Sequence, residues 1–543
     1  MSEDSPPLLE VENLTVDFHS ATGAFRATHA VSFAVEAGET LVILGESGSG
    51  KSVSASAIMG LIDTPPGEIV SGAIRYRGTD ITRLGEEQRR AFNGRKVAII
   101  FQDPLSHLNP VYTIGWQLQE VFTGHHKAGA AEARRRSIEI LRRVGIPEPE
   151  LRIDWYPHQF SGGQRQRIMI GMAIALGPEL LIADEPTTAL DVSVQAQILE
   201  LLQDLQRSEG LAIVMITHDL EVAANMADRI VVMKSGRIVE EGTARQVFDT
   251  PQHAYTQQLM HALPETGGGV ATTREGPPVL EVEHLCKTYQ MAAGIFTPAR
   301  ELRAVDDVSF TLRRGETLGL VGESGSGKST VARMLLRLTE ASSGRALFHG
   351  EDILTMDRRA LLGFRRRVQM VFQDPYSSMN PRMDVFSIIS EPWQIHRDIL
   401  PRARWRDRVA ELLDLVGLSP EHAQRFPHQF SGGQRQRIAI ARALACDPEL
   451  VVCDEAVSAL DVSIQMQIVR LLADLRDRLG LSYIFITHDL PIVRNLADRI
   501  LVMKAGRVVE EAPTETLFRN PRDAYTRTLI EAAPRPKWLE AAA

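Results

Sequence analysis

The feature of this 543-residue chain that most restricts its fold is an exact internal repeat. Residues 45–52, Gly-Glu-Ser-Gly-Ser-Gly-Lys-Ser, recur letter for letter as residues 322–329. Each copy is followed, in the same order, by Phe-Gln-Asp-Pro, Ser-Gly-Gly-Gln-Arg, an apolar run ending in Asp-Glu, and Ile-Thr-His-Asp. Two repeats of this length are tandem domains and not the short units of a solenoid. We therefore expect the same domain to occur twice.

The spacing between equivalent residues shows where the two repeats differ. It is 271 residues from Phe18 to Tyr289, 277 from Lys51 to Lys328, and 271 again from Gln102 to Gln373. The second repeat thus has extra residues before its octapeptide and fewer after it, as surface loops tolerate. From the Ser-Gly-Gly-Gln run to the histidine the spacing stays at 270, which indicates a rigid core.

Composition shifts divide the chain into three parts, with a first domain at 1–264, a linker at 265–278 and a second domain at 279–543. The linker is rich in Gly, Thr and Pro and has almost nothing to bury, so it is expected to be flexible. Each domain ends in a short extension that begins at Pro251 or Pro521 and contains Ala-Tyr-Thr three residues later. A helix-like apolar stretch follows and reaches Pro264 or Pro534.

The overall composition is that of a globular protein, with 44% hydrophobic and 24% charged residues. No apolar run approaches the roughly 20 residues that span a bilayer, and the start lacks the features of a signal peptide, so we expect a cytoplasmic chain. A net charge of -9 argues against a dedicated nucleic-acid binder. The three cysteines form no CxxC pair, and we expect Cys446 and Cys453 only to fill space.

Short apolar runs predict the core of each domain. They lie at 41–44, 180–183 and 212–216 in the first domain and at 318–321, 450–453 and 483–486 in the second. Strands that alternate with helical patterns indicate a mostly parallel sheet covered by helices. A strand-like alternation opens each domain, with Leu9, Val11, Leu14, Val16 and Phe18 in the first. Residues near 114–160 and 385–430 are predicted to form an inserted helical subdomain.

The repeated octapeptides predict two phosphate-binding loops. Their glycines let backbone N–H groups converge on phosphate oxygens at the start of a helix. Lys51 and Lys328 would reach the β- and γ-phosphates, and Ser52 and Ser329 would bind Mg²⁺. The predicted loop residues are Gly45, Glu46, Ser47, Gly48, Ser49, Gly50, Lys51, Ser52 and Val53, and Gly322, Glu323, Ser324, Gly325, Ser326, Gly327, Lys328, Ser329 and Thr330. Alone, such a loop indicates only that a nucleotide phosphate binds.

Two adjacent acids at a strand end supply the next chemical step in each domain. Asp184 and Asp454 would hold Mg²⁺, while Glu185 and Glu455 would be general bases that orient water beside the γ-phosphate. The alternative is a strand end that merely exposes two acids. His218 and His488 would contact the γ-phosphate; a lone histidine is more often structural, but this one recurs at the constant spacing.

These motifs, in this order, resemble the ATP-binding cassette of ABC proteins, and the resemblance covers nearly the whole chain. The resemblance implies an α/β fold of two tandem P-loop NTPase cassettes. Each would have a RecA-like parallel-sheet core, an antiparallel β subdomain, an inserted α-helical subdomain and a short C-terminal extension. It further implies that Gln102 and Gln373 act at Mg²⁺ and as hinges to the helical subdomain.

In such proteins the Ser-Gly-Gly-Gln signature of one cassette contacts the nucleotide held by the other. The resemblance therefore implies two ATP sites at a head-to-tail seam, with signature residues Ser161, Gly162, Gly163 and Gln164, and Ser431, Gly432, Gly433 and Gln434. The structural alternative for each signature is a Gly-rich turn that caps a helix. Asp191 and Asp461 resemble the residues that link the two sites. Phe18 and Tyr289 match the aromatic that stacks on adenine, although either could be a strand-core residue.

Both copies keep every catalytic residue, so we predict two working sites. The departures are small: Ala456-Val457 stands where the first copy has Pro186-Thr187, and Val53 stands where the second has Thr330. They concern loop geometry and not the chemistry.

A finer resemblance is to ATP-binding subunits of the dipeptide, oligopeptide and nickel importer family, with two subunits fused. It rests on residues 102–110 and 373–381, on Tyr156-Pro-His-Gln-Phe-Ser-Gly-Gly163 and its copy at 426–433, and on the Ala-Tyr-Thr extensions. It implies ATP and Mg²⁺ as cofactors, two integral-membrane permeases and an extracytoplasmic solute-binding protein as partners, and a peripheral location on the cytoplasmic face of the cell membrane. Relatives often carry four cysteines for an iron–sulfur cluster after the extension; none follow here, so no cluster is expected.

Peptides are the expected cargo, with glutathione, an opine, a nickel chelate or an oligosaccharide as alternatives. The rival function is a soluble tandem-cassette ATPase that acts on ribosomes. Such proteins usually carry a long charged arm between cassettes, whereas this linker is short and the net charge is negative. A DNA-repair ATPase fits less well, because neither cassette is interrupted by a coiled coil or zinc module.

Overall fold

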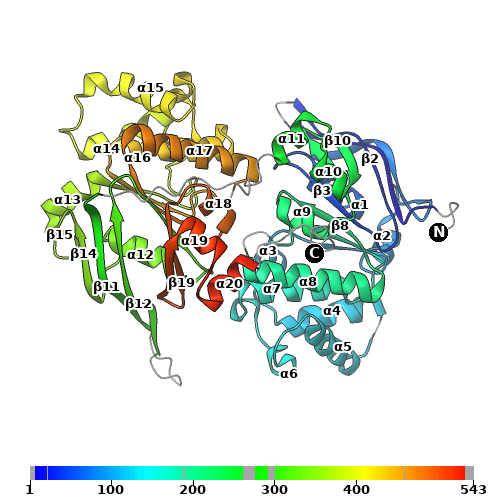
Figure 1. Cartoon of the computed structure of the whole chain (residues 1–543). Coiled ribbons are helices and arrows are strands. Elements are labelled where there is room, and N and C mark those ends of the chain that lie inside the picture. Colours follow the sequence, from blue (N-terminus) through cyan, green and yellow to red (C-terminus); the bar gives the residue numbers. More distant parts are fainter. Residues whose placement is uncertain are drawn as a thin grey trace. The chain divides into compact units, whose positions relative to one another are not determined.

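The computed structural model describes residues 6–20, 23–126, 128–187, 190–260, 276–291, 300–458 and 460–531. These residues divide into two compact units, the first reaching residue 260 and the second comprising residues 276–531 (Figure 1). Most of the predicted linker, with Pro264 and Pro534, lies outside the described residues.

Each unit is built on a six-stranded sheet with the same strand order. In the first unit the order is β10 (Arg237–Thr243), β9 (Arg229–Lys234), β3 (Thr40–Leu44), β8 (Ala212–Thr217), β7 (Leu180–Asp184) and β6 (Val97–Ile100). In the second it is β20 (Arg507–Pro513), β19 (Arg499–Lys504), β13 (Thr317–Val321), β18 (Ser482–Thr487), β17 (Leu450–Asp454) and β16 (Val368–Val371). All neighbours pair in parallel except the antiparallel hairpins β9–β10 and β19–β20. This confirms the predicted parallel-sheet cores.

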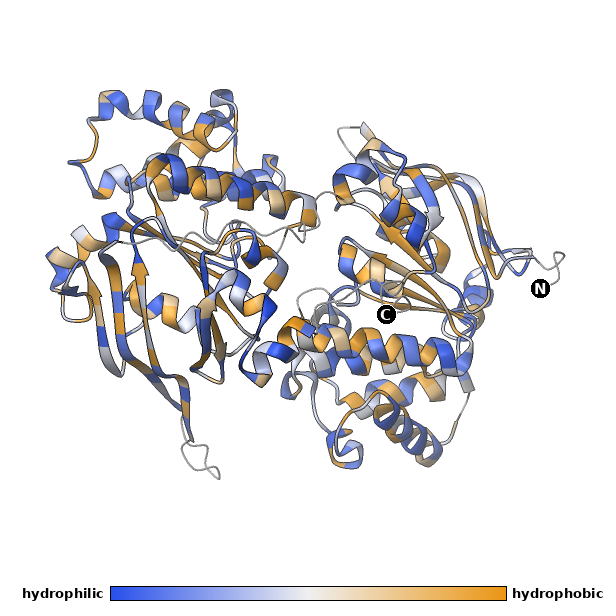
Figure 2. Cartoon of the chain, in the orientation of Figure 1, coloured by the Kyte–Doolittle hydropathy of each residue, from blue (hydrophilic) through white to orange (hydrophobic). Residues whose placement is uncertain are grey.

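Both faces of each core sheet are buried, which is why its strands are continuous apolar runs. In β17, Leu450 and Val452 belong to one hydrophobic cluster, and Val451 and Cys453 belong to another on the opposite face. Figure 2 shows these strands as mainly hydrophobic segments between amphipathic helices. Cys453 fills space as expected, and its burial raises the pKa of the thiol to about 12.

A second, antiparallel sheet completes each unit, as the resemblance implied. Its order is β2 (Gly23–Val35), β1 (Leu9–Ser20), β4 (Gly67–Tyr76), β5 (Thr79–Asp80), and in the second unit β12 (Arg300–Arg313), β11 (Pro278–Met291), β14 (Ser343–Phe348), β15 (Glu351–Asp352). The alternation of β1 shifts by one residue between Val11 and Leu14 because the register slips there, where Asn13 has a φ of 48°. That bulge keeps both Val11 and Leu14 buried.

The helices of the first unit are α1 (Lys51–Met59), α2 (Glu86–Phe92), α3 (Pro104–His107), α4 (Ile114–His126), α5 (Ala130–Arg143), α6 (Pro149–Arg152), α7 (Gly162–Ile174), α8 (Val192–Glu209), α9 (Leu220–Met226), α10 (Ala244–Asp249) and α11 (Ala254–Met260). Those of the second are α12 (Lys328–Leu335), α13 (Arg358–Arg367), α14 (Val385–Ile395), α15 (Trp405–Leu415), α16 (Gly432–Leu444), α17 (Val462–Leu479), α18 (Leu490–Arg494), α19 (Thr514–Arg519) and α20 (Ala524–Glu531). Short 3₁₀ turns occupy Pro157–Gln159, Arg402–Arg404, Pro420–Gln424 and Pro427–Gln429.

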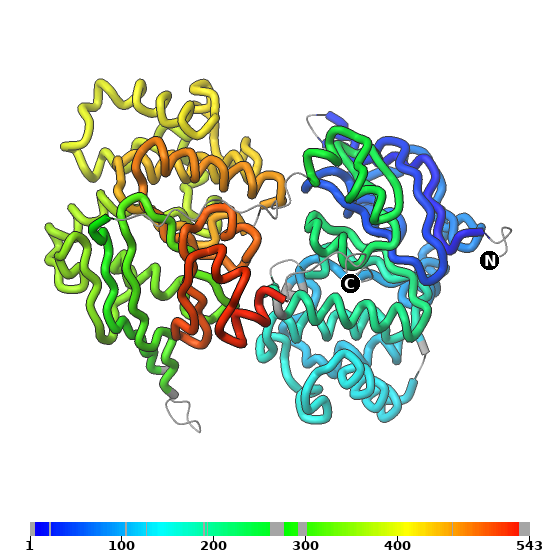
Figure 3. Tube along the Cα trace, in the orientation of Figure 1, coloured from blue at the N-terminus to red at the C-terminus, as the bar shows by residue number. Residues whose placement is uncertain are grey.

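The inserted helical subdomain lies where the sequence predicted it. It consists of α4 to α6 in the first unit and of α14 and α15 in the second, and it packs on α7 or α16 (Figure 3). The subdomain therefore joins the core through the helix that begins with the Ser-Gly-Gly-Gln signature.

Candidate active sites

Each repeated octapeptide joins a buried strand to a helix. The loop at 45–52 follows β3, and its lysine begins α1. The buried Lys51 ammonium donates to the carbonyl oxygens of Gly45 and Glu46, at 2.7 and 2.9 Å. Gly45 has no room for a side chain, because a Cβ would lie 2.3 Å from the carbonyl oxygen of Met233. The loop is thus wrapped around its own lysine.

The second loop repeats this arrangement. Lys328 donates to the carbonyl oxygens of Gly322 and Glu323, at 2.6 and 2.8 Å. A Cβ on Gly322 would lie 2.2 Å from the carbonyl oxygen of Met503. The identical sequences therefore give matching geometry.

Both loops contain a buried serine hydroxyl that fits a phosphate ligand. The Oγ atoms of Ser49 and Ser326 are buried and have no hydrogen-bond partner within the described part of the chain. A buried hydroxyl without a partner is costly, and phosphate oxygens are acceptors that would satisfy it. The presence of such a hydroxyl at the same place in both loops supports nucleotide binding.

The residues predicted to hold Mg²⁺ come together in each cassette. The Ser52 hydroxyl donates to Asp184 Oδ1 at 3.0 Å, and the Ser329 hydroxyl donates to Asp454 Oδ1 at 2.8 Å. Burial raises the pKa of both aspartates, and a divalent cation beside them would favour their ionised form. Hydroxyl and carboxylate oxygens are hard donors that suit Mg²⁺, so these residues fit the ion. When bound, Mg²⁺ would neutralise charge on the phosphates.

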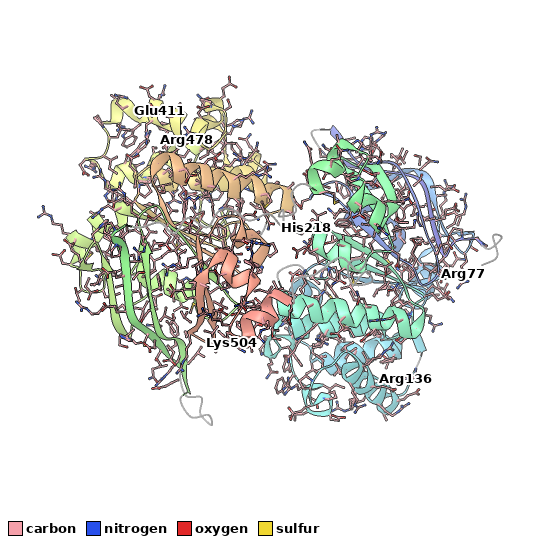
Figure 4. The ribbon with its side chains drawn as sticks, viewed as in Figure 1. Arg77, Arg136, His218, Glu411, Arg478 and Lys504 are labelled. Carbon is pink, nitrogen blue, oxygen red and sulfur yellow. The ribbon has the colours of Figure 1, made fainter. Side chains whose placement is uncertain are left out.

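The predicted general base of the first cassette lies between two other predicted residues. Gln102 Nε2 donates to Glu185 Oε2 at 2.7 Å. His218, which is labelled in Figure 4, has its Nδ1 2.9 Å from Glu185 Oε1. The sequence placed these three residues at the site, but their mutual contacts had no signal in the spacing. The amide and the imidazole fix the carboxylate from both sides.

The second cassette contains the same trio with one looser contact. Gln373 Nε2 donates to Glu455 Oε2 at 2.7 Å, while His488 Nδ1 lies 3.7 Å from Glu455 Oε1. His488 lowers the pKa of Glu455, although burial opposes the shift. This carboxylate is therefore held in its ionised, proton-accepting form.

A strained turn positions both glutamates. Glu185 and Glu455 each have a φ of 48°, which a side-chain-bearing residue rarely adopts. Their N–H groups donate to the carbonyl oxygens of Ile216 and Ile486, both at 2.9 Å, so the neighbouring strand holds the turn. Strain of this kind is common at functional sites, where the surroundings enforce it.

The signatures begin the helices α7 and α16 with a reciprocal cap. The Ser161 hydroxyl accepts from the Gln164 N–H, and the Gln164 side chain accepts from the Ser161 N–H; Ser431 and Gln434 do the same. The second signature glycine is required for packing: a Cβ on Gly163 would lie 2.3 Å from Val194 Cγ1, and one on Gly433 would lie 2.3 Å from Ile464 Cγ2. The helix-capping interpretation is correct locally, and contact with the opposite cassette stays a prediction.

The remaining predicted residues lie at two helix starts and in the antiparallel sheets. Asp191 and Asp461 are the residues before α8 and α17. Phe18 is half-buried against the core of the antiparallel sheet, whereas Tyr289 is 39% exposed with the Lys287 ammonium 4.9 Å from its ring centre. Adenine stacking therefore suits the exposed Tyr289 ring more readily than Phe18, and both roles stay predictions.

One further pair of side chains reaches the loops from outside the predicted set. The hydroxyls of Tyr255 and Tyr525 accept hydrogen bonds from the N–H groups of Glu46 and Glu323. The only signal in the sequence was the repeated Ala-Tyr-Thr of the extensions.

The fold and these sites define a P-loop ATPase with two nucleotide-binding domains. The sequence matches the ABC transporter family over residues 28–188 and 305–458. It also matches the family described as oligopeptide/dipeptide transporter, C-terminal region, over residues 239–287 and 509–541. The chain belongs to the ABC transporter family.

Two relatives extend this result over nearly the full length. The chain is 45% identical to "Glutathione import ATP-binding protein GsiA" of Escherichia coli O157:H7, over 98% of this chain and 90% of the relative. It is 47% identical to "Peptidoglycan transport ATP-binding protein YejF" of Agrobacterium fabrum, over 98% of this chain and 97% of the relative. The chain is therefore the ATP-binding and ATP-hydrolysing subunit of an ABC importer, and the ribosome-acting alternative finds no support.

Within the described residues, no helix combines the length and the apolar character needed to cross a membrane.

Proposed function

We propose that the chain powers the import of short peptides or of glutathione by hydrolysing ATP at two composite sites. Each site would join the phosphate loop of one cassette to the signature of the other, the first being 45–52 with 431–434 and the second 322–329 with 161–164. The observation that carries the proposal is that each cassette holds a complete set of loop lysine, Ser–Asp pair and Gln–Glu–His trio.

In this proposal the trio and the Ser–Asp pair divide the chemistry. Glu185 and Glu455 orient the attacking water, while His218 and His488 contact the γ-phosphate. Ser52, Gln102 and Asp184, and their counterparts Ser329, Gln373 and Asp454, would hold Mg²⁺. Phosphoryl transfer depends mainly on positioning and charge stabilisation, which such a set supplies.

The energy of hydrolysis must reach other subunits to drive transport. Two permeases are proposed to dock at grooves beside Gln102 and Gln373, on the cytoplasmic face of the membrane, with a binding protein delivering the solute. The name of the GsiA relative supports an import system and a peptide-like cargo, and the name of the YejF relative supports a transport system. We further propose that the first domain spans residues 1–264 and the second spans residues 279–543, with a linker at 265–278.

The test is affinity purification of the tagged chain from detergent-solubilised native membranes, followed by mass spectrometry after a salt wash. We expect to recover two multi-span permeases, and the proteins recovered with them should identify the binding protein. Recovery of ribosomes without permeases would contradict the proposal.

The cargo is tested with the recovered complex in proteoliposomes. Glutathione or a short peptide, delivered with the binding protein, should raise ATP hydrolysis. Stimulation only by a nickel chelate or an oligosaccharide would replace the proposed cargo with that solute.

A further inference from the structure

The C-terminal extension of each cassette touches the phosphate loop through a buried tyrosine. The Tyr255 hydroxyl, from α11, accepts a hydrogen bond from the Glu46 N–H at 3.3 Å. The Tyr525 hydroxyl, from α20, accepts one from the Glu323 N–H at 3.1 Å. The partners are 209 and 202 residues apart in sequence, so these are tertiary contacts.

The residue that the tyrosine holds is also held by the loop lysine. The carbonyl oxygen of Glu46 accepts from Lys51 Nζ at 2.9 Å, and that of Glu323 accepts from Lys328 Nζ at 2.8 Å. The Glu46 N–H also shares a peptide group with the Gly45 carbonyl oxygen, which accepts from Lys51 Nζ at 2.7 Å. In the second cassette the Glu323 N–H shares a peptide group with the Gly322 carbonyl oxygen, which accepts from Lys328 Nζ at 2.6 Å. A connected hydrogen-bonded path thus runs from the extension, through that peptide group, to the ammonium group. Because connected hydrogen bonds reinforce one another in a buried site, the lysine's position depends on that backbone.

Each tyrosine is in turn fixed by the strand hairpin beside the loop. A carboxylate from the outer strand receives two backbone N–H groups at the start of the extension helix. Glu240 accepts from Gln252 and His253 at 2.8 and 2.9 Å, and Glu510 accepts from Arg522 and Asp523 at 2.9 and 3.0 Å. The extension therefore cannot shift without breaking charge-assisted hydrogen bonds.

The inner strand of the same hairpin covers the ring. The Lys234 ammonium lies 4.4 Å from the ring centre of Tyr255. The ammonium of Lys504, a residue labelled in Figure 4, lies 4.4 Å from the ring centre of Tyr525. These lysines end β9 and β19. The ring is thus oriented by a cation–π contact as well as by packing.

We propose that Tyr255 and Tyr525 are positioning residues for ATP binding, setting the place of Lys51 and Lys328 through the loop backbone. This inference rests on the proposed nucleotide role of the loops. It gives the Ala-Tyr-Thr extension a direct role at the ATP site, and it predicts that a displaced extension weakens the loop's hold on phosphate.

The test is Tyr255→Phe and Tyr525→Phe, singly and together, in the full-length chain. Phenylalanine keeps the ring, its packing and the lysine contact, but removes the hydroxyl that accepts the hydrogen bond from the loop N–H. We expect the Kd for Mg-ATP at the affected site, measured by equilibrium dialysis with radiolabelled ATP, and the KM for ATP to rise roughly ten-fold. The kcat should change less than the KM does, and the Tm should stay close to that of the unmodified chain.

The matched control is Thr528→Ala, which deletes an exposed hydroxyl of α20 that donates to the Ala524 carbonyl oxygen of the same helix at 3.0 Å. This variant should leave Kd and KM unchanged. Unchanged Kd and KM in both tyrosine variants would overturn the inference, as would a lowered Tm without a change in Kd. If the unmodified chain itself bound no ATP, the proposed function would fail instead.

Discussion

The two cassettes agree closely where they handle ATP and differ where the core meets the helical subdomain. Lysine, serine, aspartate, glutamine and glutamate make the same contacts in both, mostly within a few tenths of an ångström. The exception is the histidine, 2.9 Å from its glutamate in the first cassette and 3.7 Å in the second. The chemistry of hydrolysis therefore tolerates little variation between the copies.

The grooves beside the two glutamines differ much more. The groove in the first cassette has a volume of about 740 Å³, and its counterpart in the second has about 450 Å³. At one lining position the first has Met172 and the second has Arg442, which reaches across to Glu391 at 2.8 Å. At the end of the first subdomain helix, Gly124 in α4 is equivalent to the exposed Ile395 in α14.

This contrast fits the proposal that the two grooves receive different permeases. An ATP site has one ligand, so both copies need the same residues. Two unlike grooves suit two unlike partners, as expected if each receives a different permease. Under the proposed function, the difference between the cassettes therefore concerns partner choice and not catalysis.

The largest expected effect tests the catalytic half of this comparison. Glu185→Gln and Glu455→Gln each remove a proposed general base, and such a base is worth roughly 10²–10⁴-fold in rate. Both should lower steady-state ATP hydrolysis by comparable factors, while Glu421→Gln, on an exposed 3₁₀ turn, should not. An unaffected rate in either active-site variant would show that the sites are not equivalent.

The second-largest expected effect tests whether the two grooves bind different permeases. Ile395→Asp replaces an apolar side chain of the second groove with a charged one. We expect permease binding to weaken roughly ten-fold or more. Gly124→Asp is the matched change at the equivalent position of the first cassette, where no apolar side chain is lost, and its effect should be smaller. The measurement is the amount of each permease recovered with the purified variant, with ATP binding as the folding control. Equal losses of the same permease from both variants would contradict two distinct grooves.

Removing the serine hydroxyl tests the metal site in each cassette. Ser52→Ala and Ser329→Ala should raise the Mg²⁺ concentration needed for half-maximal hydrolysis by about ten-fold, because each deletes one oxygen donor beside Asp184 or Asp454. The titration should shift equally for the two variants. If Mg²⁺ dependence were unchanged, these serines would not be metal ligands.

The smallest effect concerns stability. Hydrogen bonding to Lys96, at 2.5 Å, and to Arg77 lowers the pKa of Glu179 from an ordinary 4.5 to about 2 (Figure 4). A lowered carboxyl pKa stabilises the fold above pH 4.5, and this contribution is lost as the pH falls from 4.5 towards 2. Because these pairs are largely exposed, they contribute below about 1 kcal/mol.

Glu179→Gln should therefore lower the Tm slightly at pH 7 and make less difference at pH 3.5. The equivalent Glu449 has its pKa lowered mainly by Arg367, so Glu449→Gln should show the same trend. A Tm difference that did not shrink on acidification would show that the ion pairs do not stabilise either cassette.

Much of the fold could be predicted because it depends on local patterns. The apolar runs at 41–44, 180–183 and 212–216 became β3, β7 and β8, since strands buried on both faces need no polar residues. The Asp-Glu pairs followed from their place at a strand end. The bulge at Asn13 also left a trace, because the apolar alternation of β1 changes phase there.

The parts that the sequence could not predict depend on distant contacts. Nothing in the spacing indicates that Gln102 donates to Glu185, or that Tyr255 reaches Glu46 across 209 residues. The repeat marked these positions as equivalent pairs but not as partners. Pairing of each loop with the opposite signature likewise needs a measurement.

The most direct test of two equal sites is to count the ATP molecules retained by the Glu185→Gln, Glu455→Gln double variant in Mg-ATP. Both proposed bases are then absent, so we expect bound ATP to persist. The tightly held nucleotide is quantified per chain after gel filtration with light scattering. We predict two ATP molecules per monomeric chain. One ATP per chain, or ATP retained only after the chain dimerises, would contradict the account.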